Sequence, residues 1–283
     1  MTFPRTMVGG ISMPRMLIGT NWLAGWSHRS PAADKMIKNL HAEPKSIVDV
    51  LQVYLDNGID ALMGPMGRVP AIDKAVKQAE DKTGKKLIII DTPIVNVNDS
   101  AEARAEAMET FKRSKSFGST FCLIHHSSAE ELVDKNARVL KRLDDYTKMI
   151  RDCDMLPGLS AHMPELISYS DDNGYDVETY IQIYNCLGFL MQIEVETIAS
   201  IIHNAKKPVM TIKPMAAGRC TPYVGLNFVW ATLRECDMVT VGAHMPDEVH
   251  ENIEISRAFF EKRYPDLEKR SSPNMNQSAF GNA

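Results

Sequence analysis

Short apolar runs alternate with amphipathic segments along most of the chain. The apolar runs are roughly four to eight residues long, the length of buried strands, and each ends in polar residues. The segments between them carry helical spacing, shown clearly by Ile47, Val50, Leu51, Tyr54 and Leu55. We predict eight strands, which end near Thr20, Met63, Asp91, His125, Ser160, Tyr184, Lys213 and Gly242.

The stretch from Leu156 to Asn185 shows this alternation most plainly. Its first apolar run ends at Gly-Leu-Ser-Ala-His, and Pro164 then suits the first turn of a helix. Asn173-Gly174 ends that helix, and residues 177–184 form a second apolar run. One strand, one crossover helix and a parallel strand make a βαβ unit.

Start and stop signals place the other helices. The expected helices run up to about Asn57, from Pro70, from a cap at Asp99 or Ser100 to Gly118, from the capping-box pattern Ser128-x-x-Glu131 to about Cys153, and from Pro246 to about Tyr264. The glycines at 9 and 10 suit the turn of an N-terminal β-hairpin. Eight strand-helix alternations without a dividing linker predict a single (β/α)8 TIM barrel over residues 1–270, followed by a flexible tail at 271–283.

Composition narrows the class of protein. The 283 residues are 44% hydrophobic and 24% charged, as in ordinary globular proteins, and the net charge of −4 predicts no nucleic-acid partner. No run has the length of a membrane span, and the first ten residues lack a signal-peptide pattern. The five scattered cysteines favour a reducing compartment. We therefore expect a cytoplasmic enzyme with a small-molecule substrate and no membrane partner; the oligomeric state stays open.

Polar residues gather directly after the predicted strands, where an α/β barrel keeps its chemistry. Two tryptophans and a histidine in the loop after the first strand also suit a substrate cleft, or a loop packed on the barrel rim. The candidate substrate residues are Asn21, Trp22, Trp26, His28, Asn185 and His244. The candidate catalytic residues are Asp91, His125, His162 and Lys213.

Three motifs in the second half of the chain resemble the aldo-keto reductase superfamily. They are Gly-x-Ser-x-His with a Pro-Glu helix start and Gln-x-x-Asn at 158–185, Lys-Pro-Met-Ala-Ala-Gly at 213–218, and the segment 241–252. The resemblance implies a barrel whose floor is closed by a hairpin. It also implies an Asp, a Tyr, a Lys and a His in the reaction. Only His125 matches that set, because Met63 and Asp91 stand at the Asp and Lys positions and residues 64–67 contain no Tyr.

The same resemblance implies a cofactor site. Ser160 and Gln182 match positions that hold the nicotinamide carboxamide, and Glu251 and Asn252 match the pair near the adenine. Residues 244–249 contain no Arg or Lys to bind a 2′-phosphate, so NAD is expected in preference to NADP.

Each candidate also has a structural interpretation. Successive strand residues point to opposite faces, so we expect only one of His125 and His126 to face the mouth, and favour His125. Asp91 could cap the following helix, and His162 could be a loop residue. Lys213 could pair with a carboxylate such as Asp91, or have a lowered pKa and form a Schiff base. His244 is favoured as a loop residue.

Three functional hypotheses remain. The first is acid-base lyase, isomerase or hydrolase chemistry on a small carbonyl- or sugar-like substrate. In it Asp91 and His125 share a proton, or bind a divalent metal together with His162. The second is an NAD-linked oxidoreductase with an altered proton donor. The third is a binding barrel without catalysis.

Overall fold

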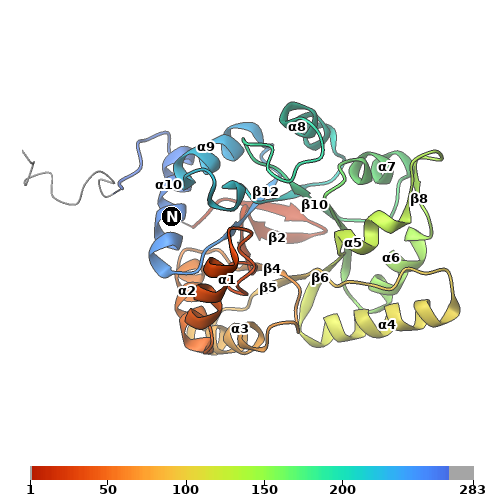
Figure 1. Cartoon of the computed structure of the whole chain (residues 1–283), viewed down its shortest axis with the longest axis horizontal. Helices are drawn as coiled ribbons and strands as arrows, with labels where there is room; N and C mark the ends of the chain where they lie inside the picture. The colour runs from red at the N-terminus through yellow and green to blue at the C-terminus, as the bar shows by residue number, and fades with distance from the viewer. Residues whose placement is uncertain (1, 268–283) are drawn as a thin grey trace, which may run out of the picture.

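Eight parallel strands close into a barrel in the computed structural model, which describes residues 2–267 (Figure 1). The strands are β3 (Met16–Gly19), β4 (Ala61–Gly64), β5 (Ile88–Asp91), β6 (Ser119–Ile124), β9 (Leu156–Ala161), β10 (Thr179–Ile183), β11 (Val209–Ile212) and β12 (Met238–Gly242). They pair in chain order, and β12 returns to β3, with Val239 opposite Met16. The predicted TIM barrel and all eight strand ends are confirmed, each end to within one residue.

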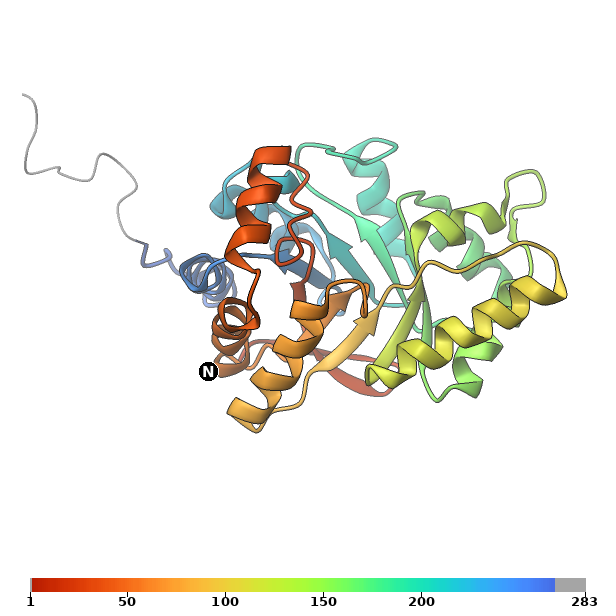
Figure 2. The ribbon, with the colours of Figure 1, turned by 60° about the horizontal axis from the view of Figure 1, so that its bottom comes forward.

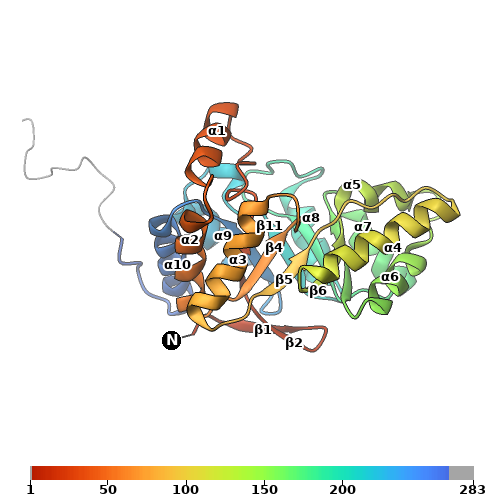
Figure 3. The same cartoon turned by 90° about the horizontal axis from the view of Figure 1, so that it is seen from below.

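An antiparallel hairpin, β1 (Arg5–Val8) and β2 (Ile11–Pro14), closes one end of the barrel. Val8 and Met13 are buried and pack with the residues that fill the barrel interior. Figure 3 shows the hairpin at the end opposite α1 (Pro31–Leu40). The predicted N-terminal hairpin is therefore confirmed and forms the floor, and the other end is the mouth.

The two faces of the barrel wall hold two separate apolar clusters. Ile90, Phe121 and Met210 belong to the cluster inside the barrel. Ile89 and Cys122, which are their neighbours along the chain, belong to the larger cluster between strands and helices. This alternation follows from the two-residue repeat of a strand. It decides which polar residues at the strand ends can reach the mouth.

Helices cover the outside of the barrel, and α4 runs along α6 there (Figure 2). The remaining α-helices are α2 (Pro44–Asp56), α3 (Pro70–Thr83), α4 (Ala101–Ser116), α5 (His126–Ala129), α6 (Leu143–Asp152), α7 (Glu165–Asn173), α8 (Val195–Asn204), α9 (Pro222–Thr232) and α10 (Pro246–Phe260). Ser100 caps α4 by accepting a hydrogen bond from the Ala103 amide, as predicted. The last helix ends at Phe260 rather than Tyr264.

The single helix expected before Asn57 is instead two helices, α1 and α2. Pro44 occupies the first turn of α2, and a proline there suits a helix start but cannot continue a preceding helix. His41 ends α1, and its buried ring lies 2.9 Å from the Ser46 hydroxyl, so the break is tied by a side-chain contact.

The long helix expected from Ser128 to Cys153 is also wrong. The chain forms α5, one 3₁₀ turn at Glu130–Leu132, and a small hairpin of β7 (Val133–Asp134) and β8 (Val139–Leu140) before α6. The Asp134 carboxylate accepts hydrogen bonds from the amides of Asn136 and Ala137, and this contact stabilises a turn in place of a helix. The Ser128 hydroxyl is buried and accepts from the Val95 amide, so it caps no helix.

Two further expectations concern the ends and the membrane. The tail predicted at 271–283 lies outside the described residues. Within residues 2–267, no helix is both long enough and apolar enough to cross a membrane.

Candidate active site

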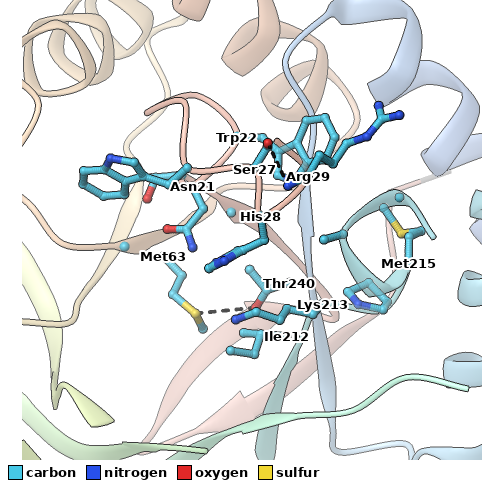
Figure 4. Close-up of a pocket in the computed structure, with 18 of the residues that line it drawn as sticks. Asn21, Trp22, Ser27, His28, Arg29, Met63, Ile212, Lys213, Met215 and Thr240 are labelled. Atoms are coloured by element: carbon cyan, nitrogen blue, oxygen red, sulfur yellow. Dashed lines mark hydrogen bonds between the residues drawn. The ribbon is translucent and has the colours of Figure 1, made fainter. Parts of the chain in front are cut away.

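A cavity of ≈ 700 Å³ opens at the C-terminal ends of the barrel strands. We call it the mouth cavity, and Figure 4 shows part of its lining. Of the candidates predicted from the sequence, those that line it are Asn21, Trp22, Trp26, His28, His125, Ser160, His162, Lys213, Glu251 and Asn252. Asp91, Gln182, Asn185 and His244 do not.

Lys213 follows β11 directly and reaches the mouth cavity through an unusual backbone turn. Ile212 already faces the cavity, so a continued strand would turn the next side chain outward. Lys213 instead adopts a φ of 62°, a left-handed conformation that costs a non-glycine residue about 1–3 kcal/mol. The strained turn therefore places an amine where the strand alone would not.

The amine of Lys213 has no counter-ion among residues 2–267. No carboxylate lies within ion-pair distance, and burial alone lowers the pKa of Lys213 to about 8. The predicted alternative of a Lys213–Asp91 pair is therefore wrong. At a pKa of about 8, about one amine in ten is uncharged at pH 7, far more than for an ordinary lysine.

Three histidine rings form a continuous stack beside Lys213. The rings of His126 and His162 are stacked with centroids 3.8 Å apart, and those of His125 and His126 are 4.2 Å apart. The expectation that only one of the adjacent pair faces the mouth is wrong, because β6 ends at Ile124. His126 begins α5 and no longer follows the alternation of a strand, so both rings line the cavity.

The surroundings of these rings keep them uncharged at neutral pH. Burial, His126 and the nearby cations Arg68 and Lys213 lower the pKa of His125 to about 4. Burial and the neighbouring His126 and Lys213 lower the pKa of His162 to about 3. The Ser127 amide donates to His125 Nδ1 at 3.3 Å, so the proton of the neutral ring is on Nε2.

Only His126 of the three has a carboxylate beside its ring. Its Nδ1 lies 4.0 Å from Glu130 Oε1, and Glu130 opposes the lowering of the pKa of His126 by burial. The same oxygen accepts hydrogen bonds from the amides of His162 and Met163. Glu130 thus fixes the start of α7 against the histidine stack and makes His126 the most basic member.

Asp91 lies on the other side of the barrel wall, which corrects the sequence prediction. Ile90 points inside and Ile89 outside, so Asp91, two residues later, points outside like Ile89. Its carboxylate accepts from the Met66 amide at 2.9 Å and lines a separate cavity of ≈ 260 Å³. Asp91 and His125 therefore do not converge on one proton. Within the described chain, no three His, Cys, Asp or Glu side chains are placed to hold a metal ion.

Three other predicted residues have local structural contacts. Gln182 is opposite Ala161 in register, on the outer face, and its amide nitrogen donates to the Ile183 carbonyl at 3.3 Å. Asn185 is buried and its side-chain oxygen accepts from the Leu187 and Phe189 amides. His244 Nδ1 lies 2.9 Å from Glu248 Oε2, a local contact expected for a loop residue.

The loop from β3 to α1 covers one side of the mouth. Ser27 donates from its amide and its hydroxyl to Asp34, which ties the loop to α1. His28 has a φ of 57°, and Figure 4 shows its ring directed toward Lys213. Trp22 lies against β12 at Gly242, where a Cβ atom would be 2.8 Å from Trp22 Cδ1. The predicted cleft residues of this loop thus line the mouth cavity.

A nicotinamide would meet only part of its expected site. Ser160 faces the mouth, but Gln182, opposite Ala161 in register, points to the outer face of the wall. Asn252 lines the cavity and its buried Oδ1 has no hydrogen-bond partner, which would suit a polar ligand. The residues present therefore do not fit a nicotinamide held as in the aldo-keto reductases. The preference for NAD over NADP stays a prediction.

Sequence reasoning missed the charged residues of the rim. Arg29, Arg68, Arg219 and Glu248 all line the mouth cavity. Arg68 lies four residues beyond the end of β4, and no spacing or motif separates such a loop residue from an ordinary surface arginine. The alternation of strand residues placed His126 away from the mouth, but its side chain lines the cavity as well.

Comparison with known proteins finds similar folds among solved structures. No protein-family model and no curated protein sequence matches the chain. A Pseudomonas aeruginosa structure described as an aldo-keto reductase aligns with a TM-score of 0.64 and 13% identity, over 90% of this chain and 95% of that one. An aldo/keto reductase of Klebsiella pneumoniae in complex with NADP and acetate gives 0.58 and 14%, over 95% and 98%.

The fold of this barrel is similar to that of these aldo-keto reductases. At this identity the likeness concerns the fold alone, and an aldo-keto-reductase-like barrel also resembles barrels of other enzymes. Thiamine phosphate pyrophosphorylase of Pyrococcus furiosus aligns with a TM-score of 0.50 and 12% identity, over 87% of this chain and 95% of that one. Because one barrel supports many reactions, the side chains of the mouth must decide the chemistry.

Proposed function

We propose that the protein is a lyase for small carbonyl compounds and that Lys213 is its nucleophile. The observation that carries the proposal is an amine in the mouth cavity with no carboxylate partner and a pKa lowered to about 8. An amine attacks a carbonyl only in its uncharged form, so a lowered pKa favours Schiff-base chemistry near neutral pH. A lysine kept for structure would instead gain stability from a paired carboxylate.

The residues around Lys213 suit each step of that chemistry. The Nζ lone pair adds to the carbonyl carbon, and transfer of one amine proton to the carbonyl oxygen gives a neutral carbinolamine. A second proton, taken from solvent, lets that oxygen leave as water, and a protonated imine remains. His125, with its proton on Nε2, is suited to donate a hydrogen bond to the carbonyl oxygen as charge develops there.

Bond cleavage then uses the imine to accept electrons. His126 takes the proton from a hydroxyl two carbons from the imine carbon, and that oxygen forms a new carbonyl. The carbon-carbon bond breaks, and its electron pair passes into the imine to give an enamine. Protonation of the enamine carbon and hydrolysis by water release the second product and restore Lys213. Glu130 near His126 supports the base role, since it opposes the loss of basicity on burial.

Trapping of the imine tests the proposal. The intact chain is incubated with a small ketone and sodium cyanoborohydride, and the alkylated peptide is identified by mass spectrometry. We expect Lys213 to be labelled first, with a rate that rises about tenfold per pH unit and levels near pH 8. An ordinary exposed lysine, with a pKa of about 10.4, would continue to gain rate above pH 8.

Two variants make the result specific. Lys213→Met should abolish the fast label, and Lys45→Met should leave it unchanged, because Lys45 is 84% exposed at the start of α2. If Lys213 is labelled no faster than Lys45, the proposal is overturned. That result would favour a binding barrel or another class of reaction.

A further inference from the structure

The charge of the mouth cavity is opposite in sign to that of the whole protein. The chain has a net charge of −4, yet four cationic side chains and only two carboxylates line the cavity in the described part of the structure. The histidines whose pKa values fall to about 4 and about 3 add no charge at neutral pH. A cavity of this sign attracts anions.

The two carboxylates lie together on one side of the cavity. Glu248 forms its contact with His244 Nδ1 at 2.9 Å and also accepts from the His244 amide. Glu251 lies on the same helix, α10, one turn further on, and has contacts of its own. Both carboxylates thus belong to the β12–α10 side of the cavity.

Of the four cations, Arg219 is engaged by other groups, and Arg29 packs against the loop that follows β11. The Arg219 guanidinium lies 3.9 Å from the ring centroid of Phe189 and donates to the Ala216 carbonyl. Arg29 packs beside Gly218, since its Cδ would be 3.6 Å from a Cβ at that glycine. These two residues shape the β11–α9 side of the rim.

Arg68 and Lys213 differ from that pair. Like that of Arg29, neither side chain forms a hydrogen bond or an ion pair within residues 2–267, but these two act on the same histidine. Both lower the pKa of His125, so both fields reach the same imidazole ring from different loops, β4–α3 and β11–α9. Arginine presents a planar fork of donors that matches a carboxylate or a phosphate. The Arg68 fork lines the same cavity as the amine, so it is placed to hold one end of a substrate while the other end reacts.

We propose that the substrate of this lyase is an anionic carbonyl compound, whose carboxylate or phosphate group binds Arg68 while its carbonyl reaches Lys213. This inference rests on the proposed function, since it assigns the substrate class of the same site. Charge-assisted hydrogen bonds contribute about 1.5–3 kcal/mol, which corresponds to a preference of about tenfold to a hundredfold.

Matched ketones test the inference in the intact chain. Pyruvate is compared with acetone, and dihydroxyacetone phosphate with dihydroxyacetone, in the imine-trapping experiment. The quantity measured is the ratio of labelling rates at Lys213 within each pair. For each pair, the labelling rate with the anionic ketone is divided by the rate with the neutral ketone. The quotient of this ratio in the wild-type protein and in Arg68→Gln is independent of the intrinsic reactivity of the ketones. We expect the quotient to be about ten or more for at least one pair, and that pair identifies a carboxylate or a phosphate as the anion.

The control removes an arginine elsewhere. Arg138→Gln lowers the charge equally but affects an exposed pair with Asp172, outside the mouth cavity, so its quotient should be near one. If Lys213 is labelled and the quotient for Arg68→Gln is also near one in both pairs, the inference is overturned and the proposed function stands.

A second measurement covers the case in which Lys213 is not labelled by any ketone. Inorganic phosphate is then titrated into the wild-type protein and into Arg68→Gln, with tryptophan fluorescence as the signal. Trp22 and Trp26 line the cavity and report on its occupation. A saturable change lost in Arg68→Gln supports an anion site after the proposed function has failed, and its absence overturns the inference as well.

Discussion

Charged side chains have partners at the floor of the barrel, and two of those at the mouth lack them within residues 2–267. At the floor, the fully buried Asp237 accepts two hydrogen bonds from the Arg234 side chain, at 2.7 and 2.9 Å, and one from the Val209 amide. Arg15 donates to the Asp237 carbonyl, and its guanidinium lies over the rings of Trp230 and Phe260. At the mouth, Lys213 and Arg68 have no such partners among the described residues.

The mouth also holds strained backbone. Lys213, His28 and Ala217 line the mouth cavity with φ values between 55° and 62°, although none is a glycine. Strain of this kind persists only where the surrounding structure holds it, and it gathers at functional sites. The comparison indicates that the floor contributes stability and that the mouth gives some of it up for reactivity, as is general for this barrel.

The largest expected effect is at the floor. Asp237→Asn should lower the free energy of unfolding by about 3 kcal/mol, because it leaves the partly buried Arg234 without its counter-charge. Urea denaturation measures the loss. The matched change Asp56→Asn breaks an exposed pair with Lys85 and should cost less than about 0.5 kcal/mol. A floor variant no less stable than this control would contradict the comparison.

A smaller effect of opposite sign is expected at the mouth. The pKa of Lys213 is lowered in the folded protein, so the unfolded chain holds its proton more tightly between about pH 8 and 10.5. Stability from this group is therefore reduced below pH 8 and rises as the pH increases toward 10.5. Lys213→Met should stabilise the protein by about 1 kcal/mol at pH 7, a value discounted for partial exposure.

Thermal or urea denaturation at pH 7 and at pH 10 checks the sign. The advantage of Lys213→Met over the wild-type protein should shrink between these two values, because the wild-type chain regains stability as its amine loses the proton in both states. A variant that is less stable at pH 7 would mean that Lys213 contributes to the fold in a way that its surroundings do not indicate.

The smallest effect is expected from a substitution on the outer face of the barrel wall. Asp91→Asn should change the labelling rate of Lys213 by less than about twofold, because the carboxylate faces the small outer cavity and not the mouth. The matched change inside the wall, His125→Gln, removes the proposed donor and should slow labelling by about a hundredfold. Equal effects of the two substitutions would show that the wall does not separate them.

The sequence predicted the barrel well because its information is local. Each apolar run and each turn signal specifies one strand or one helix start, and eight repeats of the pattern leave few alternative folds. The two helix errors came from competing local signals. Pro44 interrupted an otherwise continuous helical pattern, and the Asp134 turn replaced a helix that the Ser128 motif suggested.

The site could be predicted only in part, because it depends on the direction of side chains after each strand ends. Counting alternate residues places His125 and Ser160 inside correctly. It would also have placed Asp91 and Gln182 outside, had the inner face of each strand been known. The alternation of a strand no longer applies at Lys213, which has a left-handed backbone, or at His126, which begins α5. It also gives no information on Arg68, which lies in a loop.

The pairing of β3 with β12 sets the order in which this molecule can be completed. Met16 and Val239 are opposite one another, so the seam joins segments about 220 residues apart. On a ribosome that adds about 5–20 residues per second, the first barrel strand waits roughly ten to forty seconds for its second neighbour. Throughout that interval β3 has an open edge, and the hairpin that precedes it has no finished ring to close. Because the barrel closes between its first and last strands, the edge of β3 stays unpaired and open to other chains until nearly the whole protein has been synthesised.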